Sequence, residues 1–153
     1  MEANYPVVIL CGGLGTRMGS KTDIKPKPML KIGDRPILWH IMKTYSEYGF
    51  DDFILTLGYK SDVIKDYFLN YTEYNNSVSV NTKSGDVTNL SENDIEEWNV
   101  KLVNTGIHTL KGGRIKRIEP YIDSDRFMLT YGDGVADIDI HDLVEFHELS
   151  NSP

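Results

Sequence analysis

The sequence predicts an α/β protein built on a mostly parallel sheet that helices cover. Apolar strand-like runs alternate with amphipathic helical segments in the order strand, helix, strand, helix, which is typical of βαβ units. The first of these runs is apolar at every position, which indicates a strand buried on both faces. With 153 residues, of which 40% are hydrophobic and 25% charged, the chain is long enough for one globular domain with a real core.

The first half of the chain supplies two expected strands and two expected helices. The run 7–10 predicts a strand, and Pro36 opens a helix at a position that proline favours. Gly49 ends this helix, and 53–57 form the second strand. Ser61 is a candidate N-cap for the next helix. The apolar stripe expected on that helix comprises Val63, Ile64, Tyr67 and Phe68.

The chain turns polar over residues 72–99. We expect one weak strand at 77–82 and otherwise a mobile excursion, because turn-forming residues dominate the segment. Order returns with a strand at 100–103, and the Lys-Gly-Gly sequence at 111–113 predicts a turn.

The last expected strand and helix complete the pattern. A third clear strand is predicted at 127–131, and a helix from about Ile140 with Asp139 as its cap. The residues of this helix expected to face inward are Leu143, Phe146 and Leu149.

Charge and composition exclude several classes of function. A net charge of -7 argues against a broad nucleic-acid surface. The basic residues are unevenly distributed, since the segment 17–31 contains five of them and a single acid, Asp23. This local excess favours a small anionic ligand, although a solvated basic loop fits it equally well. No apolar run approaches the roughly 18 residues of a membrane span, and the N-terminus does not resemble a secretory signal. The one cysteine, Cys11, fits a reducing cytoplasm. We therefore expect a cytoplasmic protein with no nucleic-acid or membrane partner.

A glycine-rich turn follows the first strand and is the first candidate site. In residues 10–17, glycines allow backbone N–H groups to approach a phosphate or a base, and Arg17 supplies a forked cationic contact. The dinucleotide-binding pattern fails because Met18 stands where a glycine is needed, and no window fits the ATP-binding P-loop. By itself, a plain tight turn explains this segment about as well.

A lysine held between two prolines is the second candidate site. Pro26 and Pro28 keep the segment extended and stiff, so Lys27 is directed with little entropy left to lose. Such a cation suits a phosphate whose negative charge grows during reaction. A solvated basic linker is the alternative.

An aspartate after the third strand is the remaining candidate. Ligands of open α/β sheets bind beyond the carboxyl ends of the strands, where Asp133 follows 127–131. Its carboxylate is placed to hold Mg²⁺ that bridges nucleotide phosphates, whereas an Asp-Gly turn is the simpler explanation. Together with the glycine-rich turn and Lys27, it forms one consistent phosphate-and-metal site.

These segments resemble the sugar-phosphate nucleotidyltransferase family. The Gly-Gly-Leu-Gly-Thr-Arg turn is the signature of that family, and 25–42 resemble its glucose-1-phosphate cytidylyltransferases. Residues 58–60, 112–117 and 130–135 add to the likeness, which covers nearly the whole chain except 72–99. The resemblance implies a Rossmann-like nucleotidyltransferase fold and Mg²⁺-dependent formation of CDP-glucose and pyrophosphate from CTP and glucose 1-phosphate.

The resemblance also implies roles for individual residues. Arg17 and Lys27 would be catalytic, and Asp133 would bind Mg²⁺. The residues that would bind the nucleotide are Leu10, Cys11, Gly12, Gly13, Leu14, Gly15, Thr16, Arg17, Lys27, Thr109, Arg114 and Gly132.

The chain departs from the family pattern in two ways. Asn104 replaces a usual aspartate and Lys111 a usual threonine, which bears on the assignment of Thr109. Family members also continue further, so we expect 1–153 to be the N-terminal, nucleotide-binding portion of a homo-oligomeric enzyme. An inactive nucleotide-binding fragment, a thymidylyltransferase or another sugar nucleotidyltransferase, and a structural oligomerisation fragment stay open, because no residue by itself indicates cytosine.

Overall fold

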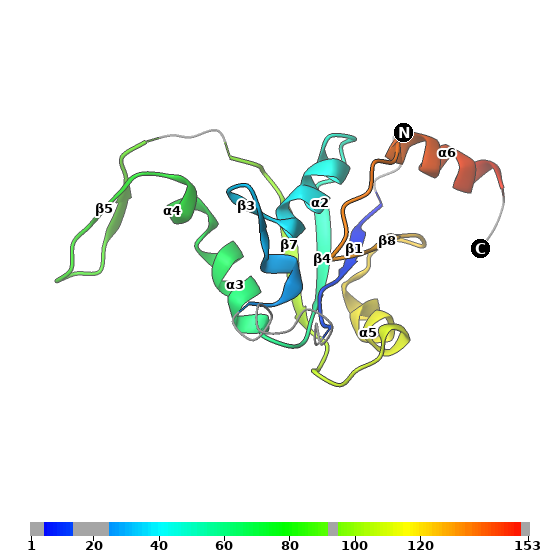
Figure 1. Ribbon diagram of the computed structural model, residues 1–153, viewed down its shortest axis with the longest axis horizontal. Helices are drawn as coiled ribbons and strands as arrows, with labels where there is room; N and C mark the ends of the chain where they lie inside the picture. The colour runs from blue at the N-terminus through cyan, green and yellow to red at the C-terminus, as the bar shows by residue number, and fades with distance from the viewer. Residues whose placement is uncertain (1–4, 14–24, 92–94, 151–153) are drawn as a thin grey trace.

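A parallel sheet forms the centre of the molecule, seen in a computed structural model that describes residues 5–13, 25–91 and 95–150 (Figure 1). Its four strands lie in the order β7-β4-β1-β8, and all three pairings are parallel. The strands are β1 (Val7–Leu10), β4 (Asp52–Leu57), β7 (Asn99–Asn104) and β8 (Met128–Tyr131). The predicted fold class is confirmed, and each of these four strands lies within one residue of its predicted bounds.

Helices cover both faces of this sheet. On one face, α2 (Ile37–Ser46) and α3 (Ser61–Leu69) pack with β1 and β4 in the larger hydrophobic cluster, whose members include Val7, Ile9 and Leu38. On the other, α5 (Lys111–Ile118) places Ile118 against Val8 and the middle of β4. Consecutive side chains of β1 therefore enter different clusters, which explains why this strand is apolar at every position.

Short elements connect these layers. They are the 3₁₀ turns η2 (Lys27–Met29) and η3 (Glu119–Tyr121), and an antiparallel pair of β2 (Lys31–Ile32) and β3 (Arg35–Pro36). Helix α2 ends at Ser46, three residues before the predicted stop at Gly49, which lies in the following turn with a left-handed φ of +83°. The predicted capping position shifts by one residue, because Lys60, with a φ of +51°, precedes α3 and Ser61 is its first residue.

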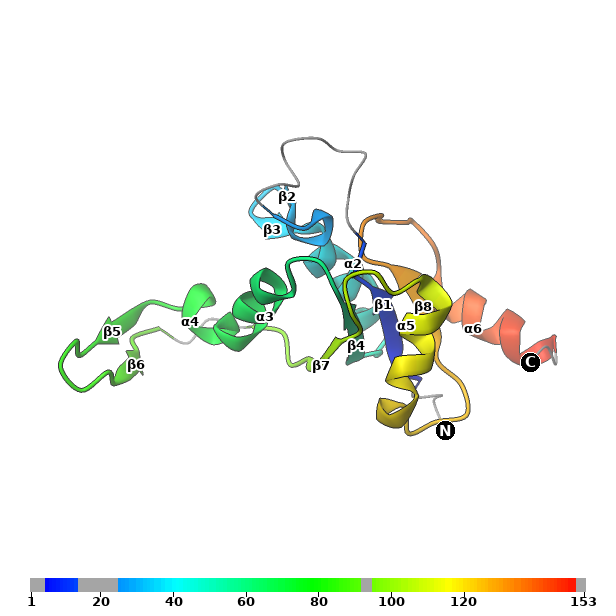
Figure 2. The same ribbon diagram turned by 90° about the horizontal axis from the view of Figure 1, so that it is seen from below.

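The polar segment after α3 contains more regular structure than the sequence predicts. It forms α4 (Tyr71–Asn75) and a hairpin of β5 (Val78–Val80) and β6 (Val87–Asn89), which extends away from the main sheet (Figures 1 and 2). The second strand escaped prediction because its three side chains are all exposed and show no alternation. The expected mobility of 72–99 stays a prediction.

Two sequence predictions are wrong in the last third of the chain. Residues 111–113 are the first turn of α5 and not a loop, because the buried Arg114 and Ile118 anchor a helix that tolerates the glycine pair. In α6 (Ile140–Leu149), Asp139 caps as expected, accepting the N–H of Asp142 at 3.1 Å. However, the three residues expected to face inward are 46%, 72% and 77% exposed, in the order Leu143, Phe146 and Leu149.

The position of α6 explains this exposure. The helix extends outward from the sheet beyond β8, so that Ile140 at its start is buried while its end meets no layer (Figures 1 and 2). Among the described residues, no helix combines the length and the apolar character that crossing a membrane requires.

Candidate functional site at the carboxyl edge of the sheet

The carboxyl ends of β1 and β8 meet because these strands are parallel neighbours. Leu10 pairs with Tyr131 at the last register position, and the N–H of Gly132 donates to the carbonyl oxygen of Leu10 at 3.0 Å. Cys11 continues the same edge, donating its N–H to Thr56 of β4 at 3.1 Å. The residues that follow these strands therefore share one rim, as expected of ligand sites in open α/β sheets.

Lys27 and Asp133 lie in contact at this rim. Lys27 Nζ lies 2.9 Å from Asp133 Oδ2, although the residues are 106 positions apart in the chain. Both side chains remain accessible, with exposed fractions of 32% and 43%. The structure thus brings together two of the three segments that the sequence analysis combined into one site.

The two prolines beside Lys27 fix its backbone. Pro26 has extended geometry, with φ -65° and ψ 148°, and its carbonyl oxygen accepts the N–H of Met29 at 2.9 Å. Pro28 and Met29 are both buried, so the lysine stands on a turn anchored in the core. This arrangement agrees with the interpretation that the prolines restrict the lysine before a ligand arrives.

Gly132 allows these segments to approach. A Cβ atom at this position would lie 2.8 Å from Cys11 Sγ, 3.1 Å from the carbonyl oxygen of Leu10 and 3.2 Å from Pro28 Cγ. Any side chain here would separate the end of β8 from β1 and from the turn that carries Lys27. Glycine at 132 is therefore a condition for the contact between Lys27 and Asp133.

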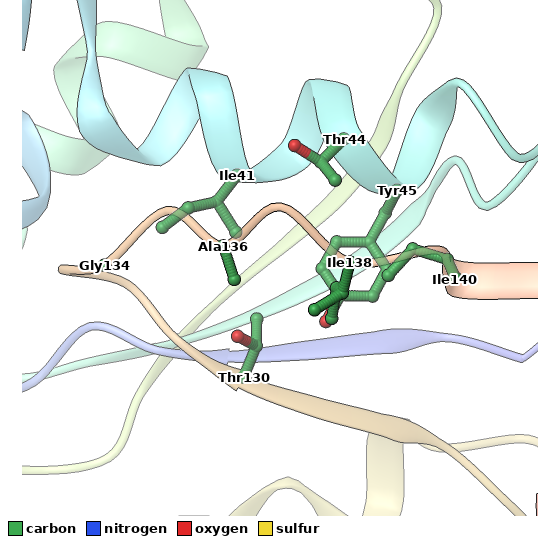
Figure 3. A pocket seen from close by; sticks show the side chains of 8 residues that line it. All are labelled: Ile41, Thr44, Tyr45, Thr130, Gly134, Ala136, Ile138 and Ile140. Atoms are coloured by element: carbon green, nitrogen blue, oxygen red, sulfur yellow. The ribbon is translucent and has the colours of Figure 1, made fainter. Parts of the chain in front are cut away.

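The loop after Asp133 is packed onto α2. Figure 3 shows a small pocket between this loop and the sheet, lined on the helix by Ile41, Thr44 and Tyr45. Thr130 of β8 and the loop residues Gly134, Ala136, Ile138 and Ile140 complete its lining. This lining places the loop that follows Asp133 beside α2 and β8.

A buried arginine supports the glycine-rich turn. Arg114 is 5% exposed and donates from Nη2 to the carbonyl oxygens of Gly12 at 2.8 Å and Ile107 at 3.2 Å. From Nη1 it donates to Leu57 O at 3.2 Å and Thr105 Oγ1 at 2.7 Å. Protein oxygens thus engage both terminal nitrogens. The predicted nucleotide contact of Arg114 stays a prediction, and what the structure shows is support of the turn.

The packing around this guanidinium requires glycine twice. A Cβ on Gly12 would lie 2.0 Å from Arg114 Nη1, and one on Gly58 would lie 2.7 Å from the same nitrogen. Burial, and secondly the charge of Arg117, lower the pKa of Arg114. Gly13, by contrast, has open space where its Cβ would be, and it is exposed.

Two further contacts made by side chains of α5 were not singled out from the sequence. Arg117 donates to Thr109 Oγ1 at 2.7 Å, so the predicted nucleotide-binding threonine is held by the helix that follows it. Lys111 donates to the hydroxyl of Tyr131 at 2.9 Å, with its ammonium 4.7 Å from the centre of the ring. The lysine at position 111, where a threonine is usual, therefore contacts the last residue of β8. Long-range hydrogen bonds of this kind leave no periodic signal in a sequence.

Cys11 is a structural residue of this edge. It is buried, and desolvation raises the pKa of its thiol, with the carboxylate of Asp133 as the second cause. A thiol that stays protonated is a poor nucleophile, in agreement with its interpretation as a small buried apolar residue. Leu14, Gly15, Thr16 and Arg17 lie outside the described residues, so their predicted roles stay predictions.

The carboxylate of Asp133 suits a magnesium ion shared with phosphates. Mg²⁺ in nucleotide sites takes one or two carboxylates and completes its shell with phosphate oxygens and water. Within the described ranges, the one grouping of three side chains able to hold a metal is His141, Asp142 and Glu145 on the exposed surface of α6, and it does not include Asp133. A magnesium ion at Asp133 would therefore need ligands from the nucleotide.

Comparison with known proteins identifies relatives of the same fold. Glucose-1-phosphate cytidylyltransferase of Salmonella typhimurium is 49% identical over 142 residues, covering 92% of this chain and 55% of the relative. The probable glucose-1-phosphate cytidylyltransferase of Bacillus subtilis is 48% identical over 141 residues, with the same coverage. The chain thus spans about half the length of the curated relatives it matches.

Solved structures agree with these matches. HddC from Yersinia pseudotuberculosis, complexed with GMP-PN, aligns with a TM-score of 0.68 at 28% identity, over 94% of this chain and 54% of that chain. UTP-bound UGPase from Acinetobacter baumannii has a TM-score of 0.70 at 21% identity, which supports the Rossmann-like fold alone. The family model described as the MobA-like NTP transferase domain matches residues 7–84, from β1 into the hairpin turn after β5. The chain therefore belongs to the MobA-like NTP transferase domain family.

Proposed function

We propose that the protein transfers a cytidylyl group from CTP to α-D-glucose 1-phosphate, forming CDP-glucose and pyrophosphate with Mg²⁺. The observation that carries this proposal is the contact of Lys27 with Asp133 near the Gly12 turn, which brings a cation and a carboxylate to one rim. Support for the base and the sugar comes from relatives named glucose-1-phosphate cytidylyltransferase at 48–49% identity.

The proposed reaction needs alignment and charge stabilisation, and no general base. A phosphate oxygen of glucose 1-phosphate, already ionised at neutral pH, attacks the α-phosphorus of CTP, and pyrophosphate leaves. Lys27 offsets the negative charge that spreads over the phosphate oxygens. A magnesium ion, when bound, neutralises the leaving pyrophosphate. The backbone at Gly12 and Gly13 lies close to the nucleotide, and Arg114 fixes that backbone by donating to the carbonyl oxygen of Gly12.

Binding requires the ion pair to exchange partners. In the structure Lys27 and Asp133 neutralise each other at 2.9 Å. In the proposed complex the ammonium turns to a phosphate oxygen and the carboxylate to the metal ion. Because both groups are partly exposed, separating them costs only about 0.2–1 kcal/mol. The pair therefore keeps the site ordered without opposing substrate binding strongly.

The test is release of pyrophosphate from CTP and glucose 1-phosphate by the purified protein in the presence of Mg²⁺. Asp133→Asn should abolish the Mg²⁺-dependent release, whereas Asp137→Asn, on the same exposed loop, should not. Retained activity in Asp133→Asn would show that this aspartate is only a turn residue. Substituting TTP or UTP for CTP distinguishes the proposed reaction from that of a thymidylyltransferase or another nucleotidyltransferase. An oligomeric assembly and a cytoplasmic location belong to the same proposal.

A further inference from the structure

The hairpin of β5 and β6, residues 77–91, projects from the molecule as an arm (Figures 1 and 2). Every residue of β6 is exposed, as are two of the three in β5, and neither hydrophobic cluster found among the described residues includes a side chain of the arm. A two-stranded hairpin by itself is marginally stable in water, and it gains stability when a further layer covers one of its faces. Within the part of the chain that the structure describes, the arm has no such layer.

Polar contacts fix the base of this arm. Helix α4 leads into the hairpin and begins at Tyr71, whose hydroxyl accepts from Trp39 Nε1 of α2 at 2.9 Å and donates to Glu96 Oε2 at 2.7 Å. At the last residue of α4, Asn75 Oδ1 accepts a hydrogen bond from Arg35 of β3. These contacts set the direction in which the arm leaves the domain, so its far end is presented to the surroundings.

The two faces of the arm differ in chemistry. Val80 and Val87 are paired directly across the hairpin, are 54% and 49% exposed, and lie on the same face as Val78. The opposite face carries the neighbouring pair of Ser79 and Thr88. An exposed apolar strand face that the rest of the fold leaves uncovered is typical of an interaction surface.

The charges of the arm favour a second copy of the chain as its partner. Because the chain has a net charge of -7, contact between two copies is opposed wherever acidic surface meets acidic surface. The arm contains only two charged side chains, Lys83 and Asp86, both exposed in the turn, and their charges cancel. None of the ion pairs of the described residues includes either of them. Under a two-fold axis, Lys83 of each copy meets Asp86 of the other, so this tip is complementary to itself.

We propose that the arm is a self-association surface, which binds the same arm of a second copy with the valine faces packed together and the tips side by side. Each hairpin then supplies the apolar layer that the other lacks. The tip charges fix the register, because a shifted pairing leaves them without partners. Three valines per copy form a small interface beside the roughly 1,200 Å² of a standard one, so the association should depend on concentration in the micromolar range. The inference goes beyond the proposed function, since the chemistry at Asp133 does not depend on it.

Sedimentation velocity of the purified protein, over a range of micromolar concentrations, measures the association. Val87→Asp places a carboxylate between the two faces and should raise the dissociation constant about a hundredfold. Thr88→Asp introduces the same charge at the next residue but on the opposite face, so this matched control should resemble wild type. Lys83→Asp and Asp86→Lys should each weaken association about tenfold, because like charges then meet at the tip. An equimolar mixture of these two variants should recover the wild-type dissociation constant, because each tip pair is again of opposite charge.

The outcomes decide between this surface and others. A wild type that sediments as a monomer at every concentration overturns the inference, as does association that survives Val87→Asp. If that remaining association is lost in Phe146→Ser, the contact lies on α6 instead. Equal weakening by Val87→Asp and Thr88→Asp would exclude the valine face.

Two further controls keep the test decisive. Should Val87→Asp not fold, as judged by circular dichroism, the mixture of Lys83→Asp with Asp86→Lys gives the same decision, and failure of the mixture to associate refutes the pairing of the tips. Pyrophosphate release is measured separately. A monomeric wild type that releases pyrophosphate therefore refutes this inference and leaves the proposed function intact.

Discussion

Replacing Lys27 by alanine separates its structural contribution from its chemical one. The side chain forms an ion pair at 2.9 Å with Asp133, but exposed fractions of 32% and 43% place this pair in the range of about 0.2–1 kcal/mol of stability. Loss of a preorganised cation at a reacting phosphate raises the barrier by roughly 3 kcal/mol, which lowers kcat about a hundredfold. Lys27→Ala should therefore fold almost as stably as wild type and turn over far more slowly.

The effect on nucleotide binding should be smaller than the effect on turnover. Removing Lys27 takes away one phosphate contact but also frees the Asp133 carboxylate from its ion pair, so the affinity for CTP should fall less than tenfold. Thermal unfolding, calorimetric titration with CTP and pyrophosphate release measure the three quantities. Lys25→Ala, in the same basic segment and exposed, is the matched control. A kcat within twofold of wild type, or a change in KM alone, would remove Lys27 from the mechanism.

The remaining predictions concern the glycines that bring the site together. Gly132→Ala should lower the free energy of unfolding by about 1–3 kcal/mol and weaken Mg²⁺-dependent CTP binding, because its Cβ would lie 2.8 Å from the buried Sγ of Cys11. Gly134→Ala, whose Cβ meets nothing within 4 Å, should do neither. Denaturant unfolding measures the stability of the two variants, and calorimetry measures their CTP binding. Equal behaviour of the two variants would mean that the close approach at the end of β8 is unimportant. Gly12→Ala should displace Arg114, whose Nη1 lies 2.0 Å from the added atom, and reduce CTP affinity more than Gly13→Ala, which meets nothing within 4 Å. The reverse order of affinities would contradict the role assigned to the arginine.

The strands of the sheet could be predicted because burial on both faces leaves a direct trace in composition. Val7, Val8 and Ile9 are each fully buried, and an uninterrupted apolar run is the pattern that such burial selects. The end of α6 could not be predicted in the same way. The helix itself was predicted correctly, but the spacing of its apolar residues shows only which side chains share one face. Whether another layer covers that face depends on the tertiary structure, and Phe146 is 72% exposed.

Part of the site follows from local rules, and part requires the fold. The stiff Lys27 segment and the strand-end position of Asp133 are visible in the sequence, since proline geometry and strand ends are local features. The supporting role of Arg114 is not, because its bond to Gly12 spans 102 positions and the Lys-Gly-Gly sequence before it predicts a turn. Likewise, the hydrogen bond from Arg117 to Thr109 joins the last turn of α5 to the loop before this helix, a contact that only the three-dimensional arrangement decides.

The central claim is that the rim formed by β1, β8 and η2 binds a nucleotide triphosphate with magnesium. Backbone amide chemical shifts of ¹⁵N-labelled protein, followed during titration with CTP and Mg²⁺, test it most directly. We predict that the largest changes fall on Gly12, Gly13, Lys27 and Asp133, and that they depend on Mg²⁺ at Asp133. Changes centred instead on the pocket between β8 and α6, around Leu143, or no saturable changes at all, would contradict the account.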